Sequence, residues 1–135
     1  MTEEGALVRS FVVAEKRDRL AGFLASPKDR HKATALLPHF RSLDPRWVVA
    51  IPADRQEPAA IERALRARGA GETCHVISED PNLDGQRLSL RSALDRVVGQ
   101  GMGTILSCVP GVLACYEGEG PADRCILDAR APAEL

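Results

Sequence analysis

The stretch TILSCVPGVLACYE, at residues 104–117, decides the fold. Two runs of strand length flank Pro110-Gly111, a pair typical of a tight turn, so the stretch predicts an antiparallel hairpin. Side chains alternate between the two faces of a strand, and with Val109 opposite Val112 both faces are apolar. One face carries Leu106, Cys108, Leu113 and Cys115, and the other carries Ile105, Val109, Val112, Ala114 and Tyr116. A hairpin that is apolar on both faces lies inside the protein.

Apolar residues recur at helical spacing or in short runs elsewhere in the chain, which predicts the order α-α-β-α-β-α-β-β-β. The helices span residues 6–25, 27–40, 58–68 and 90–98, and the strands span 47–51, 73–78, 104–109, 112–117 and 124–128. Strands that alternate with helices imply right-handed crossovers and a parallel core. We therefore expect one compact α/β domain over residues 1–135, with an N-terminal αα-hairpin at 6–42 and an α/β core at 46–130. Its sheet is expected to be mostly parallel, with a C-terminal antiparallel hairpin.

Local signals mark several helix ends. Ser26 precedes Pro27 and has Asp29 three residues later, the pattern of an N-cap. Pro58 suits the first position of the next helix, and Ser89 is a second N-cap residue. These signals place helix starts more firmly than the apolar spacing alone.

Composition limits the class of protein. The 135 residues are 44% apolar and 27% charged, which is ordinary for a globular domain. Aromatic residues are scarce at 4%, which argues against a surface that stacks nucleic-acid bases. The N-terminus lacks the basic and apolar regions of a signal peptide, and no run approaches the length that spans a bilayer. We therefore expect a cytoplasmic protein with no membrane partner.

Charge is unevenly distributed. Residues 9–68 hold 13 Lys/Arg and 7 Asp/Glu, whereas residues 69–135 hold 5 and 10. Either the two halves complement each other within the fold, or the first half meets an acidic partner. The first interpretation is the simpler one because the basic surplus is modest beside that of nucleic-acid-binding arms.

Positive charge is densest on the predicted αα-hairpin. Acidic neighbours Glu15, Asp18 and Asp29 dilute it, so we expect little affinity for random duplex DNA or RNA. A patch of mixed sign suits an acidic protein surface or self-association. The expected partner-binding residues are Lys16, Arg17, Arg19, Lys28, Arg30 and Lys32.

The cysteines do not form a metal-binding motif. Cys74, Cys108, Cys115 and Cys125 contain no C-x-x-C pair and match no zinc spacing. Cys108 and Cys115 share a face of the hairpin, so zinc or a disulfide stays sterically conceivable. Buried, inert thiols on strands are the simpler interpretation. We expect no metal and no cofactor.

Carboxylates follow two predicted strands. Asp54 comes after the first strand, and Asp80 and Asp84 come after the second. In an open parallel sheet both loops meet at the carboxyl edge, where these weak catalytic candidates could hold Mg²⁺. They could equally be ordinary turn and cap residues.

A glycine cluster precedes the hairpin. Gly99, Gly101 and Gly103 follow a helix, whereas a dinucleotide-binding loop precedes one, so they predict helix termination and a turn. If the strand that follows is parallel to the first two, the cluster lies at the opposite edge from Asp80.

Two resemblances add to this interpretation. The chain is similar to a family of short uncharacterised bacterial proteins over Gly101-Met102-Gly103-Thr104, Ser107-Cys108, Pro110-Gly111, Leu113-Ala114 and Tyr116-Glu117-Gly118, and over the text from Glu15-Lys16-Arg17 to Asp44-Pro45-Arg46. That resemblance implies a bacterial source and carries no activity. Residues 57–80, with Ala64-Leu65, Gly69-Ala70 and Ser78-Glu79-Asp80, resemble the helix-strand unit of kink-turn-binding ribosomal proteins and of the third domain of peptide-release factors. This second resemblance implies a three-layer α/β fold that binds RNA or protein.

Two functions are consistent with these observations. The first is a non-enzymatic intracellular protein-interaction module that uses the basic αα-hairpin. The alternative is a Mg²⁺-dependent enzyme acting on a phosphorylated small molecule or nucleotide at the Asp54/Asp80 edge.

Overall fold

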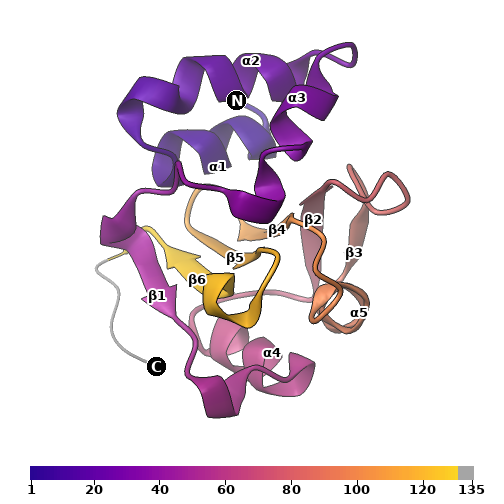
Figure 1. The fold of residues 1–135 in the computed structure, drawn as a ribbon. Helices are drawn as coiled ribbons and strands as arrows, with labels where there is room; N and C mark the ends of the chain where they lie inside the picture. Colours follow the sequence, from indigo (N-terminus) through magenta and orange to yellow (C-terminus); the bar gives the residue numbers. More distant parts are fainter. Residues whose placement is uncertain (131–135) are drawn as a thin grey trace.

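The computed structural model describes residues 1–130, which form a six-stranded sheet with helices on both faces (Figure 1). The helices are α1 (Glu3–Phe11), α2 (Arg17–Ala25), α3 (Arg30–Thr34), α4 (Pro58–Ala67) and α5 (Leu90–Val97). The strands are β1 (Val48–Ala50), β2 (Thr73–Ser78), β3 (Arg87–Ser89), β4 (Thr104–Val109), β5 (Leu113–Glu117) and β6 (Cys125–Asp128). Helices α1, α2 and α3 cover one face of the sheet, and α4 and α5 cover the other. None of the helices in residues 1–130 has the length and apolar character that a bilayer crossing requires.

The sheet is antiparallel throughout, so the prediction of a mostly parallel sheet is wrong. Its strand order is β1-β6-β5-β4-β2-β3, and every neighbouring pair is antiparallel. The strands that a helix connects, β1 with β2 and β3 with β4, do run in the same direction. They are not neighbours, however, because β6, β5 and β4 separate the first pair and β2 separates the second. Alternation of strands and helices predicts that a helix joins strands of the same direction, but it does not predict which strands pair. This pattern predicts that the strands at 73–78 and 104–109 are parallel, whereas β3 lies between them in the chain and β2 and β4 are antiparallel neighbours.

The β4–β5 hairpin is confirmed. Leu106 pairs with Cys115 as predicted, and a bulge after Ser107 makes Val109, instead of Cys108, the partner of Leu113. The extra residue in the bulge shifts the alternation of side chains between the two faces by one position. Val109 therefore packs on the face opposite to the predicted one. The predicted face is confirmed for seven other residues. Leu106, Cys108, Leu113 and Cys115 pack towards α4 and α5, and Ile105, Ala114 and Tyr116 pack towards α1, α2 and α3.

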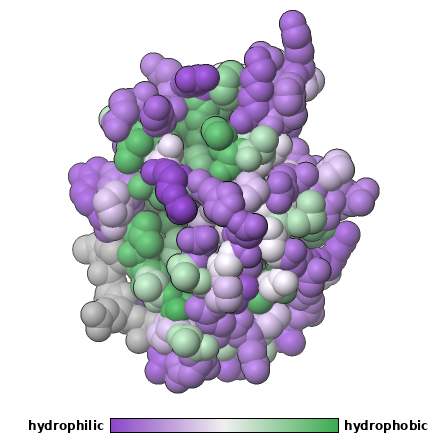
Figure 2. Space-filling view, in the orientation of Figure 1, coloured by the Kyte–Doolittle hydropathy of each residue, from purple (hydrophilic) through white to green (hydrophobic). Residues whose placement is uncertain are grey.

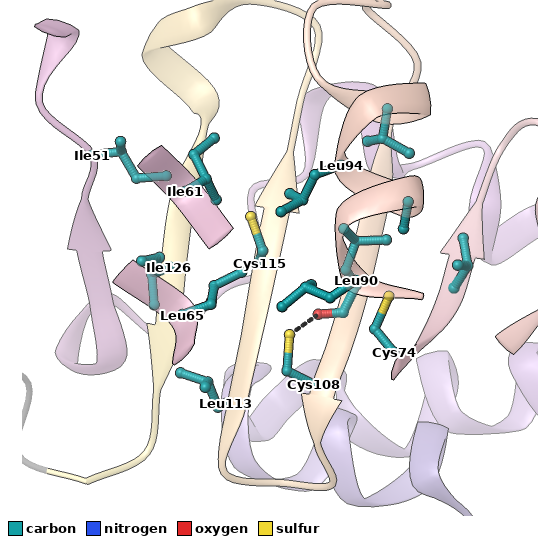
Figure 3. Packing of buried hydrophobic residues seen from close by; sticks show 14 of the residues in the cluster. Ile51, Ile61, Leu65, Cys74, Leu90, Leu94, Cys108, Leu113, Cys115 and Ile126 are labelled. Carbon is teal, nitrogen blue, oxygen red and sulfur yellow. Dashed lines mark hydrogen bonds between the residues drawn. The ribbon is translucent and has the colours of Figure 1, made fainter. Parts of the chain in front are cut away.

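The core beneath α4 and α5 follows the predicted helix signals. Pro58 occupies the first turn of α4, and the hydroxyl of Ser89 accepts a hydrogen bond from the Ser92 amide at 3.3 Å. Leu90 and Leu94 of α5 are fully buried and point towards the strands in Figure 3. Both helices therefore use a single apolar stripe to cover the sheet.

The opposite helical layer differs from the predicted αα-hairpin. The helix expected over residues 6–25 is two helices, because Val12 is extended and forms a β-bridge with Leu43. Two adjacent β-branched residues, Val12 and Val13, favour this break. Ser26 does accept a hydrogen bond from the Asp29 amide at 3.3 Å, but the α-helix begins only at residue 30.

Candidate functional site

A groove of about 350 Å³ lies on the outer surface of the helical layer, between α2 and α3. Figure 2 shows apolar side chains gathered over this layer, with hydrophilic side chains on either side of them. The groove is lined by Lys16, Arg19, Leu20, Phe23, Lys32, Leu36, Phe40 and Ser42. Its lining thus combines four apolar residues with three cations and a hydroxyl.

The floor of the groove is anchored in the core. Leu20 and Phe40 are 8% and 6% exposed and belong to the cluster between the helices and the sheet. The Phe40 ring lies 6.4 Å from the Tyr116 ring between centroids, and the Phe40 amide donates to the Tyr116 hydroxyl at 3.1 Å. Leu36 differs, because 50% of it is exposed. The Leu36 side chain therefore faces solvent beside the buried apolar floor that Leu20 and Phe40 form.

Two of the cations of the groove, Arg19 and Lys32, lie beside the Phe23 ring. The Arg19 guanidinium carbon is 5.4 Å from the Phe23 ring centre, and Lys32 Nζ is 5.6 Å from the same centre. Lys32 also pairs with Asp29 at 3.2 Å. Neither Lys16 nor Arg19 has an ion-pair partner within residues 1–130. The groove consequently has positive charge that the described part of the chain does not neutralise.

Three of the six expected partner-binding residues, Lys16, Arg19 and Lys32, therefore line one groove. The others lie elsewhere. Lys28 is exposed in the turn before α3, and Arg17 Nε donates to the Val12 carbonyl at 2.8 Å.

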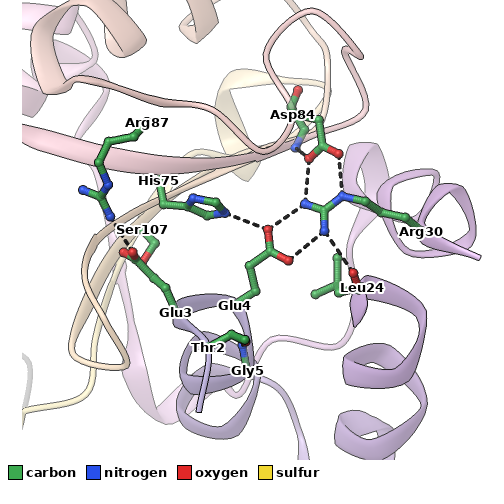
Figure 4. A network of polar contacts seen from close by, with 11 residues as sticks. Thr2, Glu3, Glu4, Gly5, Leu24, Arg30, His75, Asp84, Arg87 and Ser107 are labelled. Atoms are coloured by element: carbon green, nitrogen blue, oxygen red, sulfur yellow. Dashed lines mark hydrogen bonds and ion pairs between the residues drawn. The ribbon is translucent and has the colours of Figure 1, made fainter. Parts of the chain in front are cut away.

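Arg30 is partly buried and is held by a network of polar contacts (Figure 4). Its guanidinium donates to both carboxylate oxygens of Glu4, at 2.7 and 2.6 Å, and to both of Asp84, at 2.6 and 3.0 Å. A fifth hydrogen bond reaches the Leu24 carbonyl at 3.0 Å. The hydrogen bonds that Arg30 donates to Glu4 and Asp84 raise the pKa of Arg30. Arg30 joins three segments and is not a free cation of the surface.

Other pairs also link the two halves of the chain. Arginines of the basic first half pair with carboxylates of the acidic second half: Arg30 with Asp84 at 2.6 Å, Arg41 with Asp123 at 3.9 Å and Arg68 with Asp128 at 2.9 Å. The interpretation that the halves complement each other within the fold thus accounts for part of the asymmetry. The groove cations account for another part.

A serine and a histidine lie beside the Arg30 network. His75 Nε2 is 2.7 Å from a Glu4 oxygen, and Ser107 donates to Glu3 at 2.8 Å. Although His75 and Ser107 are opposite each other on β2 and β4, each bonds a different carboxylate. Ser107 is 1% exposed, so its hydroxyl is not presented to a substrate. The cluster fastens α1 to the sheet. Sequence reasoning missed it because its members are 71 and 104 residues apart.

The acidic residues of the enzyme hypothesis are not brought together. Three strands lie between β1, which precedes Asp54, and β2, which precedes Asp80 and Asp84. Four inter-strand steps of about 4.8 Å separate them by roughly 19 Å, too far to share one Mg²⁺. Asp84 accepts from the Ser78 amide and Asp80 from the Asn82 amide, both at 2.9 Å. Within residues 1–130, no group of three His, Cys, Asp or Glu residues could hold a metal ion.

The glycine cluster lies at the edge opposite to the one expected. The Gly103 amide donates to a Glu79 carboxylate oxygen, and the Glu79 amide donates to the Gly103 carbonyl, both at 3.0 Å. The cluster is therefore beside the loop that holds Asp80, because β4 is antiparallel to β2. Gly99 ends α5 with a φ of 82°, as a helix-terminating glycine should.

The four cysteines lie on strands β2, β4, β5 and β6, as predicted, and all are free and buried. Burial raises the pKa of Cys74 to about 11 and the pKa values of Cys108 and Cys125 to about 12. It also raises the pKa of Cys115 well above the ordinary value. Thiolates, the reactive form, are therefore scarce at neutral pH.

We expect the native protein to react slowly with a thiol-specific chromogenic disulfide, because its thiols are buried and protonated. All four cysteines should react within the mixing time once the chain is unfolded in guanidinium chloride. The colour yield before and after unfolding measures this difference. One fast thiol in the native protein would contradict the buried placement of that residue.

Acid should weaken the network around Glu4. Burial opposes ionisation of Glu4, but hydrogen bonds from Arg30 and His75 outweigh it and lower the pKa of Glu4 from 4.5 to about 2. As the pH falls from 4.5 to about 2, the unfolded chain takes up this proton before the folded one, so stability is lost in that window. Urea unfolding of Glu4→Gln should depend less on pH there than unfolding of the wild type. Glu15→Gln, a change at an exposed carboxylate, should keep the wild-type dependence.

Comparison with known proteins finds no relative. No family model matches the chain, and neither a curated protein nor a solved structure does so. The two resemblances noted in the sequence stay predictions.

Proposed function

We propose that this protein is a non-enzymatic, cytoplasmic interaction module, and that the groove between α2 and α3 binds an acidic segment of another protein. The single observation that supports the proposal is the pair of cations without ion-pair partners in residues 1–130, Lys16 and Arg19, beside an exposed Leu36. An acidic partner supplies the missing carboxylates, and its apolar side chains cover Leu36. Complementary charge raises the association rate and sets the orientation of such a complex.

An acidic protein fits this surface better than a nucleic acid does. Glu15, Asp18 and Asp29 lie in the same part of the chain as the cations, and Asp29 already pairs with Lys32. A phosphate backbone needs an extended set of cations, whereas carboxylates can be placed one at a time between charges of both signs. The apolar floor also has no counterpart in a phosphate backbone. We therefore expect weak and salt-sensitive binding to random DNA or RNA.

Charge reversal tests the proposal. The variant Lys16→Glu/Arg19→Glu/Lys32→Glu should bind fluorescent acidic peptides at least about tenfold more weakly than the wild type, since three favourable pairs become repulsive. The matched control is Arg55→Glu/Arg63→Glu/Arg96→Glu, which makes the same change in net charge at exposed arginines outside the groove. Fluorescence anisotropy at physiological salt measures both. Equal loss in the two variants, or no acidic peptide bound by the wild type, would overturn the proposal.

A further inference from the structure

We infer that the occupant of the groove is an acidic amphipathic α-helix of a partner protein that lies along α2, an inference that rests on the function proposed above. The α2 side of the groove is a single stripe, because Arg19, Leu20 and Phe23 lie three, four and seven residues after Lys16, the N-cap residue of α2. With a rise of about 1.5 Å per residue, this stripe is about 10 Å long. That length matches two turns of a helix lying alongside it.

The hydrogen-bonding needs of the occupant's backbone favour a helix over an extended segment. Arg19, Leu20 and Phe23 of α2 and Lys32 of α3 line the groove, and helical backbones use their amides and carbonyls internally. An extended peptide pressed into the groove would bury amides and carbonyls without partners, which is costly. Strand addition needs a sheet edge, and the edge strands β1 and β3 contribute no residue to the groove lining. A helix enters the groove with its backbone already satisfied.

The positions of the charges specify the face of that helix. Arg19 belongs to α2, Lys16 is the residue just before α2, and Lys32 belongs to α3, so cations lie on both sides of the groove. The Phe23 ring lies beside both Arg19 and Lys32, with its centre 5.4 and 5.6 Å from their charged groups, and the exposed Leu36 adds to the apolar surface to be covered. The matching helix therefore carries a narrow apolar stripe with carboxylates on both sides of it. A helix with carboxylates on one side only would leave one wall unpaired.

Another protein suits this role better than a second copy. Within residues 1–130, only Met1, Leu36 and Met102 are large, apolar and exposed, and neither methionine is on a helix. The apolar stripes of α4 and α5 are buried against the sheet. No helix of the described chain thus has a free apolar stripe to offer to the groove of a second molecule.

The experiment uses the full chain and synthetic 16-residue peptides. The first has Leu at positions i, i+3, i+4 and i+7 of an alanine-rich helix, with Glu on both flanks of this stripe. The second has the same sequence except that one central Ala is replaced by Pro, which breaks the helix and keeps the charge. The third has Lys in place of every Glu. Binding is followed by anisotropy, helicity by circular dichroism, and the bound surface by amide chemical-shift changes in the protein.

We expect the first peptide to bind at least about tenfold more tightly than the other two and to gain helicity on binding. Leu36→Ala should weaken its binding several-fold without lowering the melting temperature, because Leu36 is half exposed. Equal affinity for the Pro-containing peptide would overturn the helical occupant while leaving the proposed function intact. Preference for the Lys peptide, or shift changes confined to surfaces other than the groove, would overturn both. Dimerisation of the protein alone through the groove would contradict the choice of a second protein as the occupant.

Discussion

Gly103→Ala should be among the most damaging single-methyl changes in this protein. A Cβ built at residue 103 would lie 2.2 Å from the Pro38 nitrogen and 2.3 Å from the Leu37 carbonyl carbon. Both atoms belong to the backbone, so neither can rotate away as a side chain would. The start of β4 and the turn at residues 37–39 must therefore separate. We expect a loss of about 3 kcal/mol in the free energy of unfolding, the upper end of the usual range for overpacking.

Gly22→Ala is the matched control for Gly103→Ala. A Cβ at residue 22 meets nothing within 4 Å, and the position lies inside α2, where alanine is the better helix former. This variant should be more stable than the wild type by about 0.5–1 kcal/mol. Urea unfolding of both variants measures the difference. A loss below about 1 kcal/mol for Gly103→Ala would mean that the backbones do not approach as closely as described.

Gly103→Ala should also disturb the groove, because the turn that it displaces leads into the groove floor. The turn at residues 37–39 is held by a hydrogen bond from the Tyr116 hydroxyl to the Leu37 carbonyl and by one at 2.9 Å from the Glu119 amide to the Pro38 carbonyl. Phe40, which forms part of the groove floor, follows directly. A glycine read from the sequence as one of three turn residues thus supports the binding surface by allowing two backbones to touch.

Elements defined by local signals could be predicted from the sequence. The strand expected at 73–78 has those bounds, and α4 begins at Pro58 as expected. Such elements depend on residues a few positions apart, namely an apolar run, a proline or a capping serine. The short strand β3 was missed, because its three residues contain a single apolar side chain, Leu88, which is too little to show an alternation.

Strand pairing could not be predicted, because it depends on contacts between distant segments. Val48 of β1 pairs with Leu127 of β6, and nothing near either residue specifies the other. The segment Cys125–Asp128 looked like a short terminal strand, yet it is a central one with all four residues buried. Only its full burial distinguishes it, and burial is a property of the finished fold.

The candidate site could be predicted only in part, because it too depends on contacts between distant segments. The basic run that contains Lys16 and Arg19 is visible in the sequence, and so is the apolar spacing of the segment around Leu36. What the sequence could not show is which cations stay free. Arg30 resembles its neighbours in the chain, but Glu4 and Asp84, which neutralise it, come from two other parts of the molecule.

Leu94→Ala should cost about 2–4 kcal/mol of the free energy of unfolding. Leu94 is 0% exposed, in the layer of apolar side chains between α5 and the sheet. Removing its isobutyl group forfeits the burial of those atoms and leaves a cavity, because the structure around a deleted core side chain relaxes only partly. Ser92→Ala, at an exposed position of the same helix, should change stability by no more than about 0.5 kcal/mol. Chemical denaturation of the two variants and the wild type measures both effects. If Leu94→Ala lost less than about 1 kcal/mol, α5 would not be packed on the sheet by the face assigned to it.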